Sequence, residues 1–162
     1  MSRPPWPDSV ERVSTALRAA GAEARIEEFT DGTPTAEAAA TAVGCELRRI
    51  VKSLLFDCDG SWVLVLVSGD RRADATKVAQ ATSANRARVA GAAQVLAATG
   101  YEPGAVAPVG LARVGRILVD QRIPTDGVLW VGAGSSWHMA GLPASELIRV
   151  TRGELVDVAD DR

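Results

Sequence analysis

The chain has 162 residues, of which 47% are hydrophobic and 23% are charged, and its formal net charge is −2. This size and composition are typical of one globular domain, and the acidic balance argues against a protein that coats nucleic acid electrostatically. No apolar run approaches the ~20 residues of a membrane-spanning helix, and Met1–Asp8 lacks the regions of a signal peptide. We therefore expect a cytoplasmic protein that contacts neither DNA nor a membrane. Recognition of one RNA end through a small pocket is compatible with this charge.

The sequence offers little for a metal site. Its two cysteines, Cys45 and Cys58, form no CxxC pair, and His138 is its single histidine. A zinc site needs roughly three or four clustered protein ligands, so we expect neither a metal nor a cofactor. A disulfide is not expected in a cytoplasmic chain either.

The first part of the chain predicts an irregular arm, a helix, a strand and a second helix, over residues 1–8, 9–20, 24–29 and 34–43. The arm is rich in proline, and Trp6 is expected to dock it. Asp8 is the predicted N-cap of the first helix, and Gly21 ends it. Pro34 is assigned to the first turn of the second helix, where its missing N–H is tolerated.

Arg48–Val67 is the stretch around which the chain is organised. Two apolar runs flank Asp59-Gly60, which is a strong hairpin signal, and their continuous hydrophobicity predicts a central hairpin covered on both faces. Lys52 interrupts the first run, on one face with aliphatic neighbours. Its ammonium must find an anionic partner, reach solvent or lose its charge. Lys52 is therefore a charge that protects an edge strand from pairing, a side chain whose stem is buried while its ammonium reaches solvent, or a cation at the floor of a ligand pocket.

The chain beyond the hairpin alternates short helices and strands. Helices are predicted over residues 75–81, 94–99 and 143–150, and strands over residues 86–90, 116–120, 128–132 and 154–158. Asp74 is the predicted cap of the first of these helices, and Gly100 the stop of the second. The alternation predicts an α+β, or mixed α/β, single domain over residues 9–159.

Two glycine-bearing loops are candidate binding features beside Lys52. In Gly104-x-x-x-Pro108 the glycine lets a ligand approach the backbone amides and the proline stiffens the loop. Such a loop can hold a ribose, a carboxyl oxygen or an oxyanion, or it can be a tight connection between a helix and a strand. Gly132-Ala133-Gly134-Ser135 lacks the third glycine and the following helix of a dinucleotide fingerprint. His138 suits a catalytic triad poorly and is expected to line a pocket or lie on the surface.

Five short motifs occur in order along the chain: Thr35-Ala36-Glu37-Ala38-Ala39, Ile50-Val51-Lys52-Ser53-Leu54, Thr99-Gly100-Tyr101 leading into Gly104-x-x-x-Pro108, Gly132-Ala133-Gly134-Ser135, and Glu146-Leu147-Ile148-Arg149-Val150-Thr151. Together they resemble the YbaK/prolyl-tRNA-synthetase-associated domain family. The similarity covers roughly Val10–Val158, and it suggests a freestanding protein.

The resemblance implies a trans-acting aminoacyl-tRNA deacylase, which hydrolyses the ester of mischarged tRNA in translation proofreading. It implies a mixed, partly barrel-like β-sheet surrounded by helices, with no metal. Lys52 falls on the family's key lysine and is the implied catalytic residue. The implied partner is the 3′ CCA end of a mischarged tRNA, with a synthetase or an elongation factor as a further partner.

The residues expected to bind the substrate are Phe29, Gly104, Ala105, Val106, Ala107, Pro108, Gly132, Gly134, Ser135 and His138. Phe29 lies about where some members carry tyrosine, and Trp137-His138-Met139 replaces a segment where some carry a functional aspartate. Two other functions stay open. The protein could bind a nucleotide or an aminoacyl-tRNA 3′ end without turnover, in association with a synthetase, or it could be a subunit docked on a synthetase or elongation factor.

Overall fold

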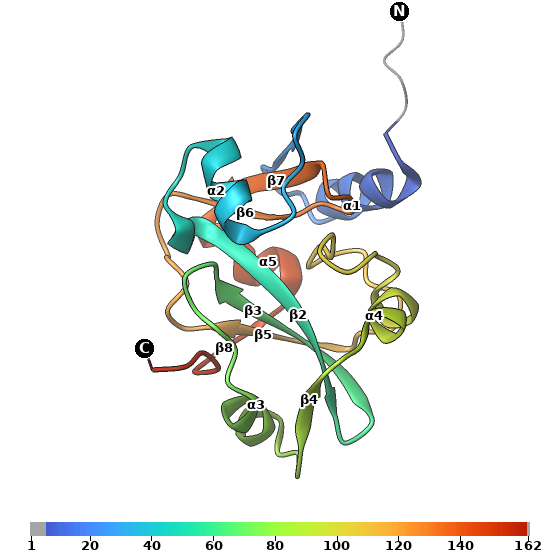
Figure 1. Ribbon diagram of the computed structural model, residues 1–162, viewed down its shortest axis with the longest axis vertical. Helices are drawn as coiled ribbons and strands as arrows, with labels where there is room; N and C mark the ends of the chain where they lie inside the picture. Colours follow the sequence, from blue (N-terminus) through green and yellow to red (C-terminus); the bar gives the residue numbers. More distant parts are fainter. Residues whose placement is uncertain (1–5, 162) are drawn as a thin grey trace, which may run out of the picture.

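A long antiparallel hairpin forms the centre of the computed structural model, which describes residues 6–161 (Figure 1). Its strands are β2 (Ile50–Cys58) and β3 (Ser61–Ser68). Asp59 and Gly60 connect them with φ angles of 54° and 91°, and positive values at both positions are what a two-residue type I′ turn requires. The predicted hairpin and its central position are confirmed.

The other strands extend the sheet on both sides of this hairpin. The strand order is β1-β7-β6-β2-β3-β5-β8, and β4 pairs with β2 outside this path. The β2/β6, β3/β5 and β5/β8 pairs are parallel and the remaining pairs are antiparallel, so the sheet is mixed as predicted. The bounds are Arg25–Glu28 for β1, Ala87–Val89 for β4, Arg116–Asp120 for β5, Val128–Gly132 for β6, His138–Pro143 for β7 and Glu154–Val156 for β8.

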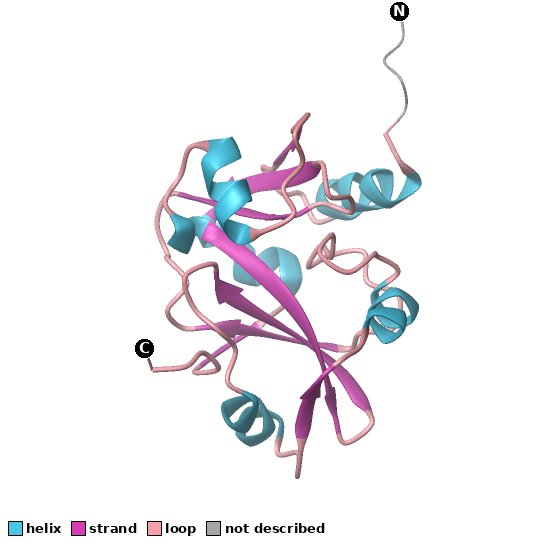
Figure 2. Ribbon diagram, viewed as in Figure 1, coloured by secondary structure: helices cyan, strands magenta, loops and turns pink. Residues whose placement is uncertain are grey.

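Helices lie around the strands (Figure 2). The α-helices of residues 6–161 are α1 (Asp8–Ala19), α2 (Ala36–Val43), α3 (Ala75–Thr82), α4 (Ala92–Thr99) and α5 (Leu147–Thr151), and short 3-10 helices cover Leu47–Arg49 and Ala144–Glu146. None of these helices combines the length and the apolar character needed to traverse a bilayer. One face of β2, β3, β5, β6 and β7 packs into a single core together with Leu147 of α5, so the sheet curves around that core.

The first two helices begin differently from the prediction. The N-cap of α1 is Pro7, whose carbonyl accepts the N–H groups of Val10 and Glu11, while Asp8 lies inside the first turn and caps nothing. Thr35 is the cap of α2, because its hydroxyl accepts the Ala38 N–H at 3.0 Å, and Pro34 therefore precedes the helix. Asp74 caps α3 as predicted, with its carboxylate accepting two N–H groups of the first turn.

Strand β7 was not predicted from the sequence. It pairs with both β6 and β1, and it takes up Pro143, which the sequence assigned to a helix over residues 143–150. Gly141 weakens the strand signal in this segment. The ring of Trp130 packs across this glycine, and a Cβ there would lie 3.0 Å from that ring, so any side chain would push the ring away.

Part of the predicted N-terminal arm, residues 1–5, lies outside the described residues. Trp6 packs edge-on against the ring of His138, with centroids 5.7 Å apart. This contact joins the start of α1 to β7, as expected for a docking tryptophan.

The chain end is held by a buried carboxylate, which makes Asp120→Ala a test of the fold. Asp120 Oδ1 accepts the buried N–H groups of Val158 and Ala159 at 3.0 and 3.1 Å. Because alanine leaves both donors unsatisfied at about 1–3 kcal/mol each, we expect the free energy of unfolding to fall by about 3 kcal/mol in urea titrations. Asp120→Asn keeps an acceptor oxygen, so its free energy of unfolding should fall clearly less. If both variants lose the same amount, the two hydrogen bonds do not account for the effect.

Candidate functional site

The strand pairing of β2 is interrupted on one side. There β6 pairs only with Ile50 and Val51, and β4 pairs with Phe56–Cys58, so Lys52–Leu55 faces no strand on that side. The other side of β2 pairs with β3 along almost its whole length. A cavity of about 300 Å³ lies against the interrupted stretch, at the lower end of the size range of small-molecule sites.

Four parts of the chain line this cavity: Thr33, Pro34, Thr35, Ala36 and Ala39 before and in α2, Ile50–Leu54 in β2, Gly104 and Val106 in the glycine–proline loop, and Gly132 and Met139 in β6 and β7. Among the predicted site residues, the cavity therefore brings together Lys52, Gly104, Val106 and Gly132. Lys52 is the only ionisable side chain in the lining, and most of the other side chains are aliphatic.

Lys52 is half-buried, and its ammonium donates a hydrogen bond to the backbone carbonyl of Arg71. Within residues 6–161, no carboxylate lies close enough to Lys52 to form an ion pair. Burial lowers the pKa of the Lys52 ammonium below the ordinary lysine value, while the charge of Glu37 opposes that shift and Arg72 adds to it. The cation is thus solvated in part by a carbonyl but is not neutralised.

The loop that contains Gly104 is held at its base by Tyr101. The buried Tyr101 hydroxyl donates to the Val109 carbonyl at 2.7 Å, and Thr99 Oγ1 accepts the Tyr101 N–H at 3.0 Å. Burial raises the pKa of the Tyr101 phenol, so it stays a proton donor. Arg12 of α1 covers the same ring, with its guanidinium carbon 4.5 Å from the centroid.

Within this loop only two positions face the cavity. Gly104 is exposed, with a φ of 82°, and Val106 lines the wall beside it. Ala105, Ala107 and Pro108 are buried and do not line the cavity. Because the base of the loop is rigid and its middle is buried, the backbone of Gly104 and Val106 is held in a fixed position at the cavity.

Gly132 sets the distance between the two glycine-bearing loops. A Cβ at this position would lie 2.4 Å from the Val106 carbonyl oxygen, so a side chain does not fit without movement of the loop. The loops are also joined where the Gly134 N–H donates to the Ala105 carbonyl at 3.0 Å. Gly132 therefore adjoins the glycine–proline loop backbone to backbone, on the same wall of the cavity.

Gly134, Ser135 and His138 lie outside the cavity lining. Ser9 Oγ donates to the Gly134 carbonyl at 2.6 Å, which turns this residue toward α1. Ser135 Oγ lies 2.5 Å from His138 Nδ1. His138 is buried, its Nε2 has no hydrogen-bond partner within residues 6–161, and Glu28 Oε1 is 3.9 Å from that atom. Burial lowers the pKa of His138, which favours the neutral ring.

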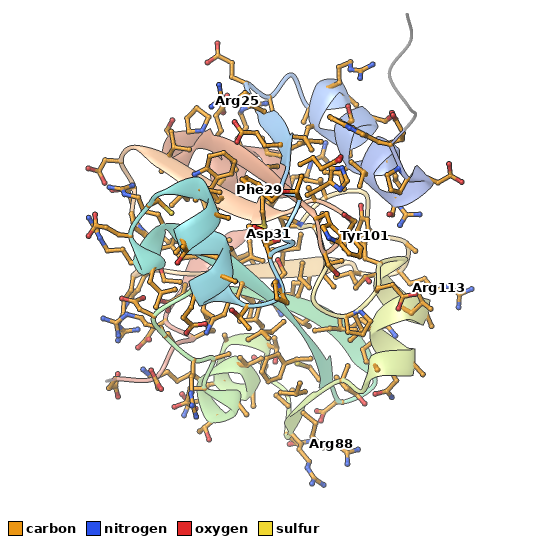
Figure 3. The ribbon with its side chains drawn as sticks, turned by 45° about the horizontal axis from the view of Figure 1, so that its top comes forward. Arg25, Phe29, Asp31, Arg88, Tyr101 and Arg113 are labelled. Carbon is orange, nitrogen blue, oxygen red and sulfur yellow. The ribbon has the colours of Figure 1, made fainter. Side chains whose placement is uncertain are left out.

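Phe29 lies next to the cavity without lining it. Figure 3 shows Phe29 and Asp31 following each other on the segment between β1 and α2. The Phe29 ring meets Trp130 edge-on with centroids 6.4 Å apart, and it packs with Ile50 and Met139, which do line the cavity. Phe29 therefore supports the wall from behind.

The sequence reasoning missed the wall formed by Thr33, Pro34 and Thr35. These residues follow β1 by a short connection, and the Thr33 N–H donates to the Ser136 carbonyl at 2.6 Å. That contact joins segments far apart in the chain, and no local pattern in the sequence announces it. Across residues 6–161, His, Cys, Asp and Glu side chains nowhere gather in a group of three that could hold a metal ion.

Comparison with known proteins gives a consistent result. The sequence profile of the aminoacyl-tRNA editing domain matches residues 30–150. The chain is 34% identical over 138 residues to the proline–tRNA ligase of Xanthomonas oryzae pv. oryzae, over 83% of this chain and 24% of the ligase. It is 32% identical over 155 residues to the uncharacterized protein YwhH of Bacillus subtilis, over 94% of this chain and 98% of YwhH. The chain thus spans about a quarter of the ligase but nearly all of YwhH.

A solved structure has the same fold. The crystal structure of a candidate trans-editing enzyme for prolyl tRNA synthetase superposes with a TM-score of 0.89 and is 30% identical in sequence. The match covers 96% of this chain and 99% of that structure. The predicted mixed single-domain fold is confirmed.

The close approach at Gly132 predicts the effect of a single added methyl group. Because Gly132→Ala forces the Val106 carbonyl away, we expect it to lower the free energy of unfolding by about 1–3 kcal/mol and to speed amide hydrogen exchange in residues 104–108. Gly115→Ala is the matched control, because a Cβ there meets no atom within 4 Å. If the two variants behave alike, the contact does not constrain the loop.

Proposed function

The chain belongs to the aminoacyl-tRNA editing domain family, and from this premise we propose that it is a trans-acting deacylase that hydrolyses the ester bond of mischarged tRNA. The match to YwhH over nearly the full length of both proteins supports action as a separate protein. So does the likeness to a structure described as a candidate trans-editing enzyme. The aminoacylated 3′ end is the proposed substrate.

One observation carries the proposal. The single ionisable side chain of the cavity, Lys52, lies in the same lining as Gly104 and Val106 of the stiff loop and the adjoining Gly132. An unneutralised cation and a fixed backbone in one small cavity suit a ligand that has a polar ester and a phosphate at one end.

Lys52 is the proposed catalytic residue. An aminoacyl ester is already activated, so the site mainly has to orient it and stabilise the charge that develops on its carbonyl oxygen. A lysine ammonium has three N–H donors, and the Arg71 carbonyl accepts one of them. The others remain for the ester carbonyl or the phosphate of the terminal nucleotide.

The glycine–proline loop is the proposed holder of the terminal adenosine and the substrate carbonyl. The Ala105 N–H is already used by the Glu102 carbonyl at 3.0 Å. Gly104 and Val106 are therefore the positions of the loop proposed to contact the substrate. Ala105, Ala107 and Pro108 are proposed to act indirectly, by fixing that backbone.

Other predicted contacts have more distant proposed roles. We propose Phe29 as support for the aliphatic wall, and Gly134, Ser135 and His138 as the scaffold behind Gly132. The Ser135 and His138 side chains pair with each other outside the cavity lining, so no step of the reaction is assigned to them.

The proposed hydrolysis relies on the substrate for its base. Lys52 is the only ionisable group in the lining, and its charged form is an acid. A water molecule would attack the carbonyl carbon of the ester, assisted by the vicinal ribose hydroxyl, or by the thiol if the amino acid is cysteine. The bond between that carbon and the ribose oxygen breaks while the proton lost by the water passes, through the assisting group, to that oxygen. The products are the free amino acid and the tRNA with its ribose hydroxyl restored.

RNA contacts beyond the terminal nucleotide are proposed to be few. Charges of both signs, Arg72, Asp70 and Glu37, act on Lys52. Arg88 projects from the end of the molecule away from Phe29 and Asp31 (Figure 3). With few phosphates contacted, binding is expected to depend only weakly on salt.

The function is tested by following release of amino acid from tRNA charged with alanine, cysteine and serine in parallel. A deacylase accelerates release from at least one of them above the spontaneous rate. A protein that only binds the 3′ end would instead protect the ester, and such protection in single-turnover assays would refute the proposal.

Replacement of Lys52 by alanine tests its proposed role. We expect Lys52→Ala to lower deacylation by about a hundredfold, because charge stabilisation is lost, while the protein stays folded, because a disfavoured buried charge is removed. The control is Lys77→Ala, which removes the chain's other lysine from ion pairs with Asp157 and Asp161 away from the cavity. Full activity of Lys52→Ala on mischarged tRNAs would remove Lys52 from the mechanism.

The state of Lys52 also predicts the pH dependence. The protonated amine is the active form, and burial lowers its pKa, so the enzymatic rate should decline with rising pH at values below the ordinary lysine pKa of about 10.4. Initial rates over the neutral to alkaline range measure this, after subtraction of enzyme-free hydrolysis at each pH. In Lys52→Arg the guanidinium stays charged up to about pH 12, so residual activity should not decline. An identical decline in both proteins would assign it to another group.

A further inference from the structure

We propose that Trp137 is a stacking platform for a nucleobase, that of the nucleotide next to the terminal adenosine of the bound tRNA. This inference rests on the proposed function, since it takes an RNA 3′ end as the occupant of the cavity. It adds a contact outside the cavity that the catalytic proposal does not use.

Trp137 is unusual among the aromatic residues of the described chain. Its side chain is 54% exposed, whereas Trp130 is 9% and Tyr101 is 1% exposed. Trp6 and Trp62 are half-buried. Trp137 therefore contributes little to the core, and it presents a large flat apolar surface to the outside.

The backbone of Trp137 is fixed to the wall of the cavity. Its N–H donates to Ser135 Oγ at 3.0 Å, and its carbonyl accepts the Phe29 N–H at 2.7 Å. The neighbouring Ser136 carbonyl accepts both the N–H and the hydroxyl of Thr33, at 2.6 and 3.1 Å, and Thr33 lines the cavity. The platform and the wall thus form one hydrogen-bonded unit at the same side of the site.

Gly32 lies beside the edge of the indole. A Cβ built there would lie 3.4 Å from Trp137 Nε1, an ordinary van der Waals distance, so this backbone adjoins the ring without crowding it. The hydrogen bonds of the Trp137 backbone hold the residue at this position. A residue held in this way loses less freedom when a ligand covers its exposed part, which favours a platform over a mobile surface side chain.

The surrounding charges indicate which part of an RNA would bind here. Glu28 and Asp31 lie on the segment that the platform contacts, and Figure 3 shows Asp31 just beyond Phe29. Carboxylates repel phosphates, so a contact through the sugar–phosphate backbone is disfavoured. Stacking on the face of a base remains favourable, and it tolerates any base because every base has a π-face.

Geometry then selects the nucleotide. The terminal adenosine, held beside Gly104 and Lys52, occupies the cavity, and the rest of the strand has to leave across its rim. The unit of Thr33 and Trp137 forms part of that rim. The first base outside the cavity is therefore the one that meets the indole.

The test compares binding of two uncharged RNA hairpins with 3′ CCA ends, one intact and one abasic at the nucleotide next to the terminal adenosine. We expect Trp137→Ala to weaken binding of the intact hairpin about tenfold, within the range of a lost base–aromatic stack. The abasic hairpin should bind the unaltered protein about tenfold more weakly too, with no further loss in Trp137→Ala. Trp137→Phe should keep most of the affinity.

Leu155→Ala is the matched control, because Leu155 is 58% exposed on β8, at the far edge of the sheet from β1 and β7. It should bind both hairpins as the unaltered protein does. In deacylation assays, Trp137→Ala should raise KM about tenfold and leave kcat within about twofold, a split that general loss of structure would not produce.

The outcomes separate this inference from the proposed function. If Trp137→Ala binds the intact hairpin as tightly as the unaltered protein, the stacking proposal is overturned, whether or not the protein deacylates tRNA. If the tenfold difference is found but no charged tRNA is deacylated, the platform is supported and the hydrolytic function fails. If the loss of affinity caused by Trp137→Ala and the loss caused by the abasic nucleotide add up when both are present, the two groups do not contact each other. That result would also overturn the stacking proposal.

Discussion

The cavity exists because β2 loses its strand partner over a short stretch. Backbone N–H and C=O groups of a strand inside a sheet are normally hydrogen-bonded to the two adjacent strands. On β2, the pairing with β6 stops at Val51 and the pairing with β4 begins at Phe56, so residues 52–55 have no partner strand on that side, and Lys52, Ser53 and Leu54 line the cavity instead. The Gly104 loop and Gly132 close that space without filling it. A continuous partner strand would leave no site.

The rigidity of the walls follows from contacts between loops. Tyr101 holds the base of the glycine–proline loop, and the missing side chain of Gly132 allows its backbone to touch Val106. On the other wall, Thr33 is hydrogen-bonded to Ser136 rather than to its own helix. Each wall therefore depends on a partner distant in sequence. Such contacts reduce the entropy lost on binding, which suits a site with only one charged group.

Much of the fold could be predicted from local sequence because hydrophobic alternation and turn chemistry agreed. The central hairpin and the strands over residues 116–120 and 128–132 were predicted with the observed bounds or nearly so. Strand β7 was missed because its glycine serves a tertiary contact with Trp130, which outweighs the poor strand propensity of that segment. Lys52 was found because a charge interrupts an apolar run. The wall that contains Thr33 was not found, because its position depends on a hydrogen bond to Ser136, and such a long-range contact leaves no periodic pattern in the sequence.

The interrupted strand has a consequence for self-association. An unpaired edge is a template on which another chain can add a strand, and exposed edges of this kind promote aggregation. Here the open stretch is bracketed by β6 and β4, so an incoming strand would find room for only a few residues, too short for stable pairing. Lys52 adds a charge at the beginning of this stretch. The lysine that suits an anionic ligand thus also disfavours strand addition by a second copy of the protein. Protection of an unpaired strand edge and ligand binding, both considered for Lys52 from the sequence, are therefore compatible roles.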